Sequence, residues 1–388
     1  MELGAPPLSL YVHMPWCVKK CPYCDFNSHG LREAPPPYAD YIDVLLADLD
    51  ADMRDFGAAL HGRPIVSVFF GGGTPSLFAP ELVARFLDGA RARLPFADAC
   101  EVTLETNPGT VEHGRFDGYL KAGVNRLSFG IQSFDDDKLR RLGRIHSAAE
   151  AAAAVKSAQD AGYANINLDL MYALPRQTLD GALADVARAV ALAPAHISHY
   201  QLTLEPNTAF AADPPPLPDD DRAWAMQEAC ETALAAAGYG QYEISAYAQP
   251  GRRCAHNLNY WQFGDYLGVG AGAHGKLTDA AAGRVHRRWK TRLPRTYLEA
   301  AGGTGRLGGD GAVDAAELPF EYMLNALRLV DGVPLAEFGR RTGLPAAAIE
   351  PALAQGRRRG WLTDDPRQLQ TTVQGQRFLN DVMALFLP

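Results

Sequence analysis

Six short runs rich in β-branched and aromatic residues alternate with longer stretches that have helical apolar spacing. The strand-like runs are 8–13, 66–70, 101–105, 126–131, 165–171 and 196–204. The helical stretches are 38–56, 80–94, 136–142 with 148–161, and 179–192. Strands that alternate with helices indicate parallel βα units. The chain is therefore predicted to be an α/β protein built on a partial (β/α)6 barrel, an open, TIM-like relative of the eightfold barrel.

Each predicted strand contains or ends in a polar or glycine-rich segment. These segments are marked by Tyr11, the run Gly71 to Gly73, Glu105, Gln132, Asp169 and Thr203. In barrels of this kind the active site forms at the carboxyl ends of the strands. We therefore expect these six segments to meet at one mouth of the barrel.

The rest of the chain suggests a smaller second unit. We expect a barrel core over 1–240, a barrel-completing segment over 241–301 and a flexible glycine-rich linker over 302–317. Residues 318–388 then form a mainly helical domain, with helices near 321–329, 335–341 and 346–359. Runs 361–363 and 369–372 could form a two-stranded wing, as in a winged-helix domain.

Three cysteines, Cys17, Cys21 and Cys24, follow the first strand with the spacing Cys-x3-Cys-x2-Cys. A structural zinc site usually closes with four ligands. Three thiolates on a [4Fe-4S] cluster leave one iron open. An open iron suits the amine and carboxylate of S-adenosylmethionine. A zinc knuckle completed by His13 or His29 stays open at this point.

Composition limits the classes of function. The chain has 388 residues, of which 47% are apolar and 21% charged, and its net charge of −8 argues against a general nucleic-acid binder. No apolar run approaches the ~18 residues of a membrane span. The first residues do not resemble a signal peptide, and Cys100, Cys230 and Cys254 are scattered, so we expect a cytoplasmic protein. The basic segments 284–295 and 357–359 suggest solvated surface, or contact with an anionic ligand or an acidic partner.

These motifs resemble the radical S-adenosylmethionine superfamily. Within it they are similar to the branch that contains oxygen-independent coproporphyrinogen III oxidase and the HemW group of heme chaperones. The resemblance implies a radical SAM core in which Cys17, Cys21 and Cys24 hold a [4Fe-4S] cluster. Matching by position implies S-adenosylmethionine contacts at Tyr11, Tyr23, Gly72, Gly73, Thr74, Glu105, Gln132, Arg144 and Asp169, to which the strand-end residue Thr203 is added. The C-terminal unit resembles the helical domain of that branch.

Three features distinguish the two groups of this branch. Phe26 stands where the oxidase has a fourth cysteine, and the segment ahead of the first strand is shorter than in the oxidase. The run from His256 to Trp261 fits the His-Asn-x-x-Tyr-Trp motif of HemW proteins. That motif implies heme binding by His256, Tyr260 and Trp261, because neutral imidazole is a good axial ligand of heme iron. The alternative is a loop whose His and Asn cap a turn and whose aromatic residues pack in the core. His274 is either a further candidate or a turn histidine.

The resemblance implies a heme chaperone that binds heme, the cluster and S-adenosylmethionine. Its expected partners are an electron donor for the cluster and heme acceptors such as respiratory cytochromes. The alternatives are radical decarboxylation of coproporphyrinogen III and a radical enzyme with another substrate. The sequence identifies no catalytic residue. It leaves open a homodimer, a peripheral membrane contact and the cleavage of S-adenosylmethionine.

Overall fold

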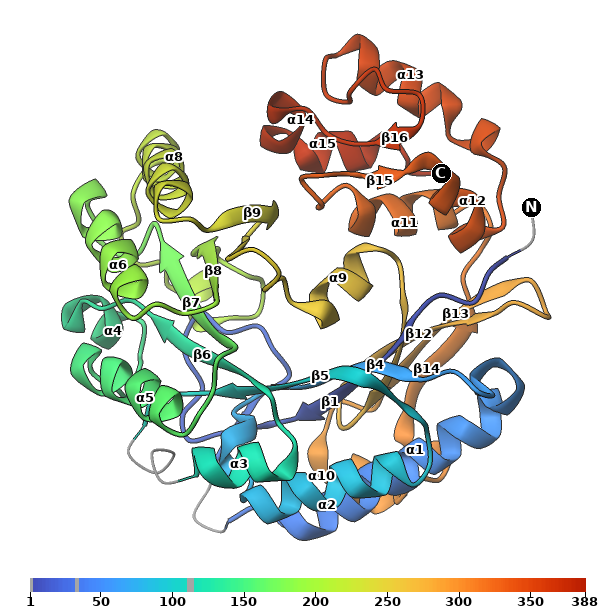
Figure 1. The fold of residues 1–388 in the computed structure, drawn as a ribbon, viewed down its shortest axis with the longest axis horizontal. Coiled ribbons are helices and arrows are strands. Elements are labelled where there is room, and N and C mark those ends of the chain that lie inside the picture. Colours follow the sequence, from blue (N-terminus) through green and yellow to red (C-terminus); the bar gives the residue numbers. More distant parts are fainter. Residues whose placement is uncertain (1–2, 32–34, 110–114) are drawn as a thin grey trace.

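A computed structural model describes residues 3–31, 35–109 and 115–388. Its centre is a run of six parallel strands that are hydrogen-bonded in chain order (Figure 1). They are β1 (Leu8–Met14), β4 (Ile65–Gly72), β5 (Phe96–Thr106), β6 (Arg126–Gln132), β7 (Ile166–Tyr172) and β8 (His196–Gln201). All six predicted strands are therefore present, and the α/β fold class is confirmed.

Segment 241–301, together with its neighbours, lengthens the sheet at both edges to twelve strands. β11 (Asp265–Val269) pairs in parallel with β1 and is followed by the antiparallel strands β12 (His274–Asp279), β13 (Arg284–Lys290) and β14 (Leu307–Ala312). At the other edge, β10 (Ala246–Ala248) and β9 (Gly240–Glu243) follow β8. The expected flexible linker is thus wrong in part, because η2 (Thr304–Arg306) and β14 occupy it and β14 is hydrogen-bonded along β13.

Helices cover the convex face of the sheet (Figure 1). They are α1 (Tyr38–Leu60), α2 (Pro80–Arg91), α3 (Phe116–Ala122), α4 (Asp136–Arg141), α5 (Ala148–Asp160), α6 (Leu179–Ala191) and α8 (Asp220–Ala236). Local sequence fixes their ends: Ser147 and Glu150 form a reciprocal capping box at the start of α5. The buried residues of α5 follow helical spacing, so one stripe packs on the sheet. Short elements complete this part: β2 (Trp16–Cys17), β3 (His29–Gly30), η1 (Pro75–Leu77), α7 (Ala209–Ala212), α9 (Ala255–Trp261) and α10 (Pro294–Ala300).

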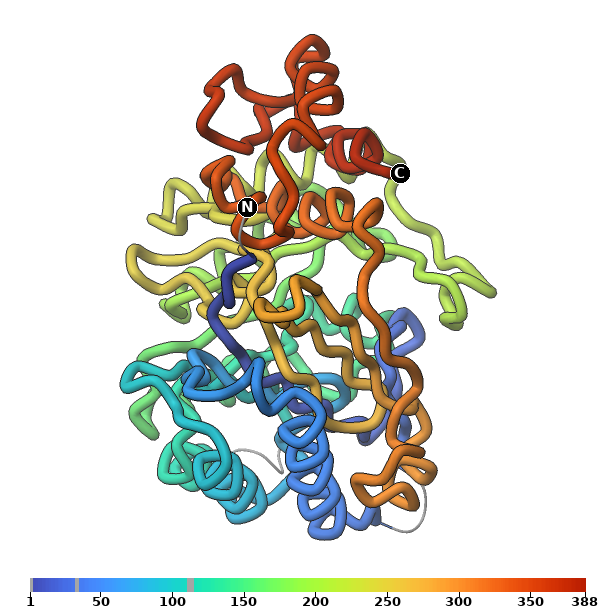
Figure 2. Tube along the Cα trace, turned by 90° about the vertical axis from the view of Figure 1, so that its right-hand side faces the viewer, coloured from blue at the N-terminus to red at the C-terminus, as the bar shows by residue number. Residues whose placement is uncertain are grey.

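The C-terminal unit lies at one end of the molecule (Figure 2). It contains α11 (Leu318–Ala326), β15 (Val333–Pro334), α12 (Leu335–Thr342), η3 (Ala346–Ala348), α13 (Glu350–Arg358), β16 (Gln368–Leu369), α14 (Val373–Arg377) and α15 (Leu379–Ala384). Its core is a separate apolar cluster that includes Tyr322, Phe338 and Leu353. The expected wing is reduced to a single antiparallel bridge between Leu362 and Thr371, because β16 pairs with β15 instead.

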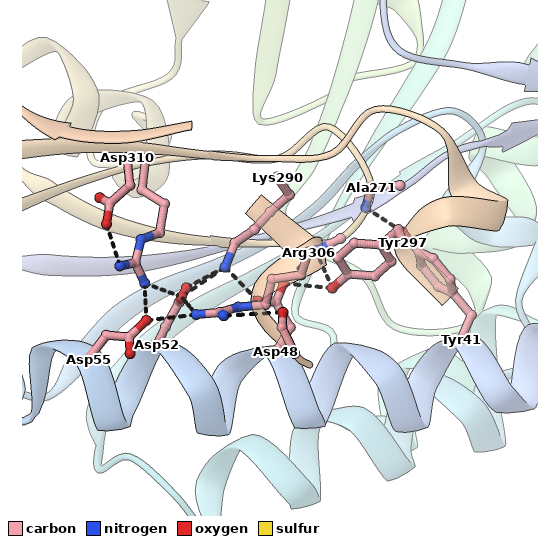
Figure 3. A network of polar contacts seen from close by, with 12 residues as sticks. Tyr41, Asp48, Asp52, Asp55, Ala271, Lys290, Tyr297, Arg306 and Asp310 are labelled. Atoms are coloured by element: carbon pink, nitrogen blue, oxygen red, sulfur yellow. Dashed lines mark hydrogen bonds and ion pairs between the residues drawn. The ribbon is translucent and has the colours of Figure 1, made fainter. Parts of the chain in front are cut away.

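A buried network of charges joins α1 to the extended edge of the sheet (Figure 3). Lys290 donates to Asp48 and Asp52 at 2.5 and 2.8 Å. Arg306 binds the same two carboxylates. Arg288 also turns inward and donates to Asp52 at 2.7 Å. The basic segment 284–295 is therefore not simply solvated surface, because alternate residues of β13 point at the acidic face of α1.

In the part of the chain that the structure describes, no helix has both the length and the apolar composition needed to cross a membrane.

Candidate functional site

The three cysteines lie on a loop over the carboxyl ends of the parallel strands. Cys17, Cys21 and Cys24 line one cavity of about 410 Å³. The loop is closed at its base by the parallel pairing of β2 and β3, in which Trp16 lies opposite His29. Burial raises the pKa of the Cys17 thiol, and the hydroxyl of Thr74 opposes that effect. The cysteine loop and the strand ends therefore meet at one cavity, as the sequence predicted.

The expected S-adenosylmethionine residues come together around the same cavity, with one exception. Those that line it are Tyr23, Gly72, Gly73, Thr74, Glu105, Gln132, Arg144, Asp169 and Thr203. Tyr11 is not among them. Its hydroxyl forms a 2.9 Å hydrogen bond with Nδ1 of His13, so it lies in a layer beneath the cavity wall.

The glycine run at the end of β4 turns the backbone toward Glu105. Gly72 has φ of +109°, and a Cβ atom there would lie 2.4 Å from Cε1 of His13. Only glycine fits both constraints. The N–H group of Gly72 then donates to Oε2 of Glu105 at 3.1 Å. A ligand amine at this point would meet a carboxyl group already held in place.

Two partly buried carboxyl groups, those of Glu105 and Asp169, line the cavity. Burial, reinforced by the charge of Asp169, raises the pKa of Glu105 to about 8. Burial also raises the pKa of Asp169, while hydrogen bonds from Asn167 and Ser198 oppose the rise. A cationic ligand would stabilise both in the charged form.

Arg144 connects the cysteine loop to the strand ends. Its guanidinium group donates to the carbonyl oxygen of Gly130 and to Oδ1 of Asn107. It also lies 3.6 Å from Sγ of Cys21. Nε of Arg144 is buried without a hydrogen-bond partner in the described structure. A buried cation beside a thiol favours the thiolate, which is the form that binds iron.

One of the two histidines that could complete a zinc knuckle is already hydrogen-bonded elsewhere. His13 does not supply a fourth ligand, because its ring nitrogens are hydrogen-bonded to Tyr11 and to the carbonyl oxygen of Asn27. The three cysteines have no disulfide partners and share one cavity.

Comparison with known proteins agrees with this geometry. The profile of the family described as "Radical SAM superfamily" matches residues 11–188, and that of the "HemN C-terminal domain" matches residues 313–378. The chain is 51% identical over 383 residues to the heme chaperone HemW of Escherichia coli, covering 98% of both chains. It is 50% identical over 382 residues to HemW of Haemophilus influenzae, again with 98% coverage of both.

The chain belongs to the HemW family of the radical SAM superfamily. A mitochondrial relative in Mus musculus, radical S-adenosyl methionine domain-containing protein 1, is 38% identical and covers the whole of this chain and 90% of its own. In three dimensions the chain is similar to coproporphyrinogen III oxidase (HemN) of Escherichia coli, with a TM-score of 0.82 and 22% identity. That match covers 98% of this chain and 90% of the oxidase and shows a shared fold.

The His-Asn-x-x-Tyr-Trp motif of the HemW family forms α9, on the inner side of the sheet. His256 is buried and stacks on Phe69 of β4 with ring centroids 5.0 Å apart. Its Nδ1 is 2.9 Å from the hydroxyl of Ser67 and its Nε2 is 3.2 Å from that of Tyr260. Trp261 packs under the guanidinium of Arg328 at 4.4 Å. In this conformation neither nitrogen of His256 is open to heme iron.

The hydrogen bonds of α9 make it part of the barrel interior. The backbone N–H of His256 donates to Glu101 of β5, and the thiol of Cys254 donates to the same carboxylate. Burial lowers the pKa of His256 to about 3, so the ring is neutral. In this structure the motif therefore forms a packed helix, and it does not cap a turn as the alternative to heme binding expected.

Several cavity residues escaped the sequence analysis. Asn107 and Tyr200 line the cavity, and the Tyr200 hydroxyl donates to Gln132 at 2.8 Å. Asn107 also donates to Thr74 at 2.7 Å. The sequence could have indicated both residues, because they lie at the ends of β5 and β8 and the strand ends were expected to form the mouth of the barrel.

Proposed function

We propose that this protein is a heme chaperone that uses the radical SAM fold to hold a [4Fe-4S] cluster and S-adenosylmethionine. Its cargo is heme, which it passes to acceptor proteins such as respiratory cytochromes. The observation that supports this most directly is full-length identity of 50–51% to proteins named heme chaperone HemW. The cavity beneath the cysteine loop supplies the binding chemistry.

Within the cavity, each residue would have a distinct task. Cys17, Cys21 and Cys24 would hold three irons as thiolates. The chemistry supplied there is one-electron reduction next to a sulfonium. Glu105 and the Gly72 backbone would bind the ligand's amino group. The ring of Tyr23, which also packs near Phe210 at 6.3 Å, would cover the adenine.

Substrate oxidation is the alternative role of the same cavity. Phe26 occupies the position of the oxidase's fourth cysteine, and its side chain is 58% exposed at the cavity mouth. An aromatic side chain offers no thiol at that point. This favours a cargo carrier over a coproporphyrinogen oxidase. We further propose a cytoplasmic location, an external electron donor, a barrel core over 1–240 and a C-terminal domain over 318–388.

A heme titration beside a turnover assay tests this function. The reconstituted full-length protein would be titrated anaerobically with heme, and separately incubated with coproporphyrinogen III, S-adenosylmethionine and a reductant. We expect one heme per chain and no vinyl groups in the porphyrin product. Robust vinyl formation would identify an oxidase. Binding of neither heme nor porphyrin would indicate a radical enzyme with another substrate.

A further inference from the structure

Three residues form one rung across the extended edge of the sheet. His274 of β12 lies opposite Trp289 of β13, and Trp289 lies opposite Gly309 of β14. The imidazole and indole rings are stacked, with centroids 6.1 Å apart and planes inclined by 19°. Because Arg288 and Lys290 point at α1, the alternation of side chains along β13 turns Trp289 to the opposite face.

Gly309 creates the space in which the indole lies. A Cβ atom at Gly309 would come within 2.0 Å of Cζ2 of Trp289. The backbone of β14 therefore serves as a floor for the ring. The glycine-rich sequence of this strand, which suggested a flexible linker, has a packing role instead.

His274 differs from three buried histidines of the barrel, His13, His196 and His256. His13, His196 and His256 each have both ring nitrogens hydrogen-bonded. His274 is exposed, and its ring makes no hydrogen bond within the described ranges. Partial burial and the positive charges of Arg287 and Arg292 lower its pKa, so the imidazole is neutral near pH 7.

The surroundings combine positive charge with apolar surface. Arg287 already has partners, since it binds the Tyr266 hydroxyl and Glu321 of α11. Arg292 is exposed, and no ion pair of its guanidinium is found in the described part of the chain. The neighbouring Leu293 side chain is 60% exposed, and that of Trp289 is 39% exposed. Large apolar side chains at this exposure, beside an unpaired cation, suit an amphipathic ligand.

We propose that His274, Trp289 and Arg292 form a heme site on the sheet face away from α1. His274 coordinates the iron through a ring nitrogen, Trp289 fixes the imidazole plane and contacts the porphyrin, and Arg292 pairs with a propionate. This inference rests on the proposed function as a heme carrier, and it assigns the cargo to a different histidine from the one in the His-Asn-x-x-Tyr-Trp motif.

The exposure of this site suits a cargo that must be released. A heme buried in a protein core needs the structure to open before transfer. Heme held at the sheet edge would stay accessible to an acceptor's ligand while His274 still bound it. The segment after β13, which carries Arg292, also lies beside the cysteine loop, since the carbonyl oxygen of Arg292 accepts a hydrogen bond from the side chain of Asn27.

The test is a heme titration of four full-length, cluster-reconstituted proteins: the parent, His274→Ala, His256→Ala and His61→Ala. His61 is also exposed but lies at the far end of α1, so it is the matched control. We expect a Soret shift at one heme per chain in the parent and in the His61 and His256 variants, with the high-spin iron that a single histidine ligand gives. His274→Ala should bind about tenfold or more weakly and lose the Soret shift.

Two further variants separate loss of a ligand from loss of structure. His274→Gly should regain heme affinity and the Soret shift when free imidazole is added. Gly309→Val should weaken heme binding by displacing Trp289. If the parent binds heme and His274→Ala keeps its affinity and its Soret shift, the inference is overturned while the proposed function stands. If the parent itself binds no heme, the proposed function fails and the site fails with it.

Discussion

The side-chain amide of Asn27 donates a hydrogen bond to the carbonyl oxygen of Ala271, 2.8 Å away, although 244 positions separate the two residues. A second bond of 2.8 Å joins the same amide to the carbonyl oxygen of Arg292. The backbone N–H of Ala271 in turn donates to Tyr41 of α1 (Figure 3). The cysteine loop is therefore anchored, three residues after Cys24, to the loop that follows β11 and through it to α1.

Replacing Asn27 with Ala should loosen the cysteine loop. The change removes two hydrogen bonds and leaves two carbonyl oxygens without that donor, at about 1 kcal/mol each. We expect the cluster to form but to be lost several-fold faster to an iron chelator, measured by the decay of visible absorption. Asn380→Ala, at an exposed position of α15, is the control. Equal decay in the two variants would show that the anchor has no effect on the cluster.

Cysteine substitutions test which thiols hold iron. Replacing any one of Cys17, Cys21 or Cys24 with Ala should abolish the brown chromophore and reduce the iron content. Replacing Cys100 or Cys230 should preserve both, because these thiols lie in the apolar core away from the cavity. Retention of the cluster after loss of Cys21 would refute the assignment.

Replacing Glu105 with Gln should change how stability depends on pH. The pKa of this carboxyl is raised from 4.5 to about 8, first by burial and then by Asp169. Between these two pKa values, Glu105 keeps its proton in the native state but loses it in the unfolded chain. Its contribution to the free energy of unfolding therefore falls as pH rises, by at most about 1.4 kcal/mol per pH unit.

Relative to the parent, Glu105→Gln should therefore gain stability from pH 5 to pH 8, because the amide cannot ionise. Urea unfolding of both ligand-free proteins across this range measures the difference. A constant difference at all pH values would mean that Glu105 is charged in the native state throughout.

Replacing Lys290 with Met should destabilise the joint between α1 and the sheet edge. Lys290 is buried, and its ammonium group binds Asp48 and Asp52. Removing one partner from a buried ionic network costs about 3–5 kcal/mol of stability, because a carboxylate stays buried with less positive charge beside it.

Urea denaturation of Lys290→Met beside Arg295→Ala checks this expectation. The exposed pair of Arg295 with Glu299 is solvated, so its loss should cost far less stability than the loss of Lys290. Equal stability losses in the two variants would show that the network around Asp48 does not support the fold.

Much of the site could be predicted from sequence because the evidence for it is local. The strands follow from short β-rich runs, and the three cysteines share one loop. Glu105, Gln132 and Asp169 lie at strand ends, and parallel strands present those ends at one edge. Once the six strands were identified, their convergence around a cavity followed from the topology alone.

Tertiary structure decided the features that depend on distant partners. His256 and Lys290 are polar residues in polar segments, and only packing against β4 and α1 shows that both are buried. The glycines of β14 suggest a flexible linker in the sequence. In the structure they leave room for the ring of Trp289 on the neighbouring strand. His274 becomes a candidate ligand for the converse reason, because its ring remains exposed. Local spacing determines which elements form, whereas burial and partners arise from contacts between elements far apart in the chain.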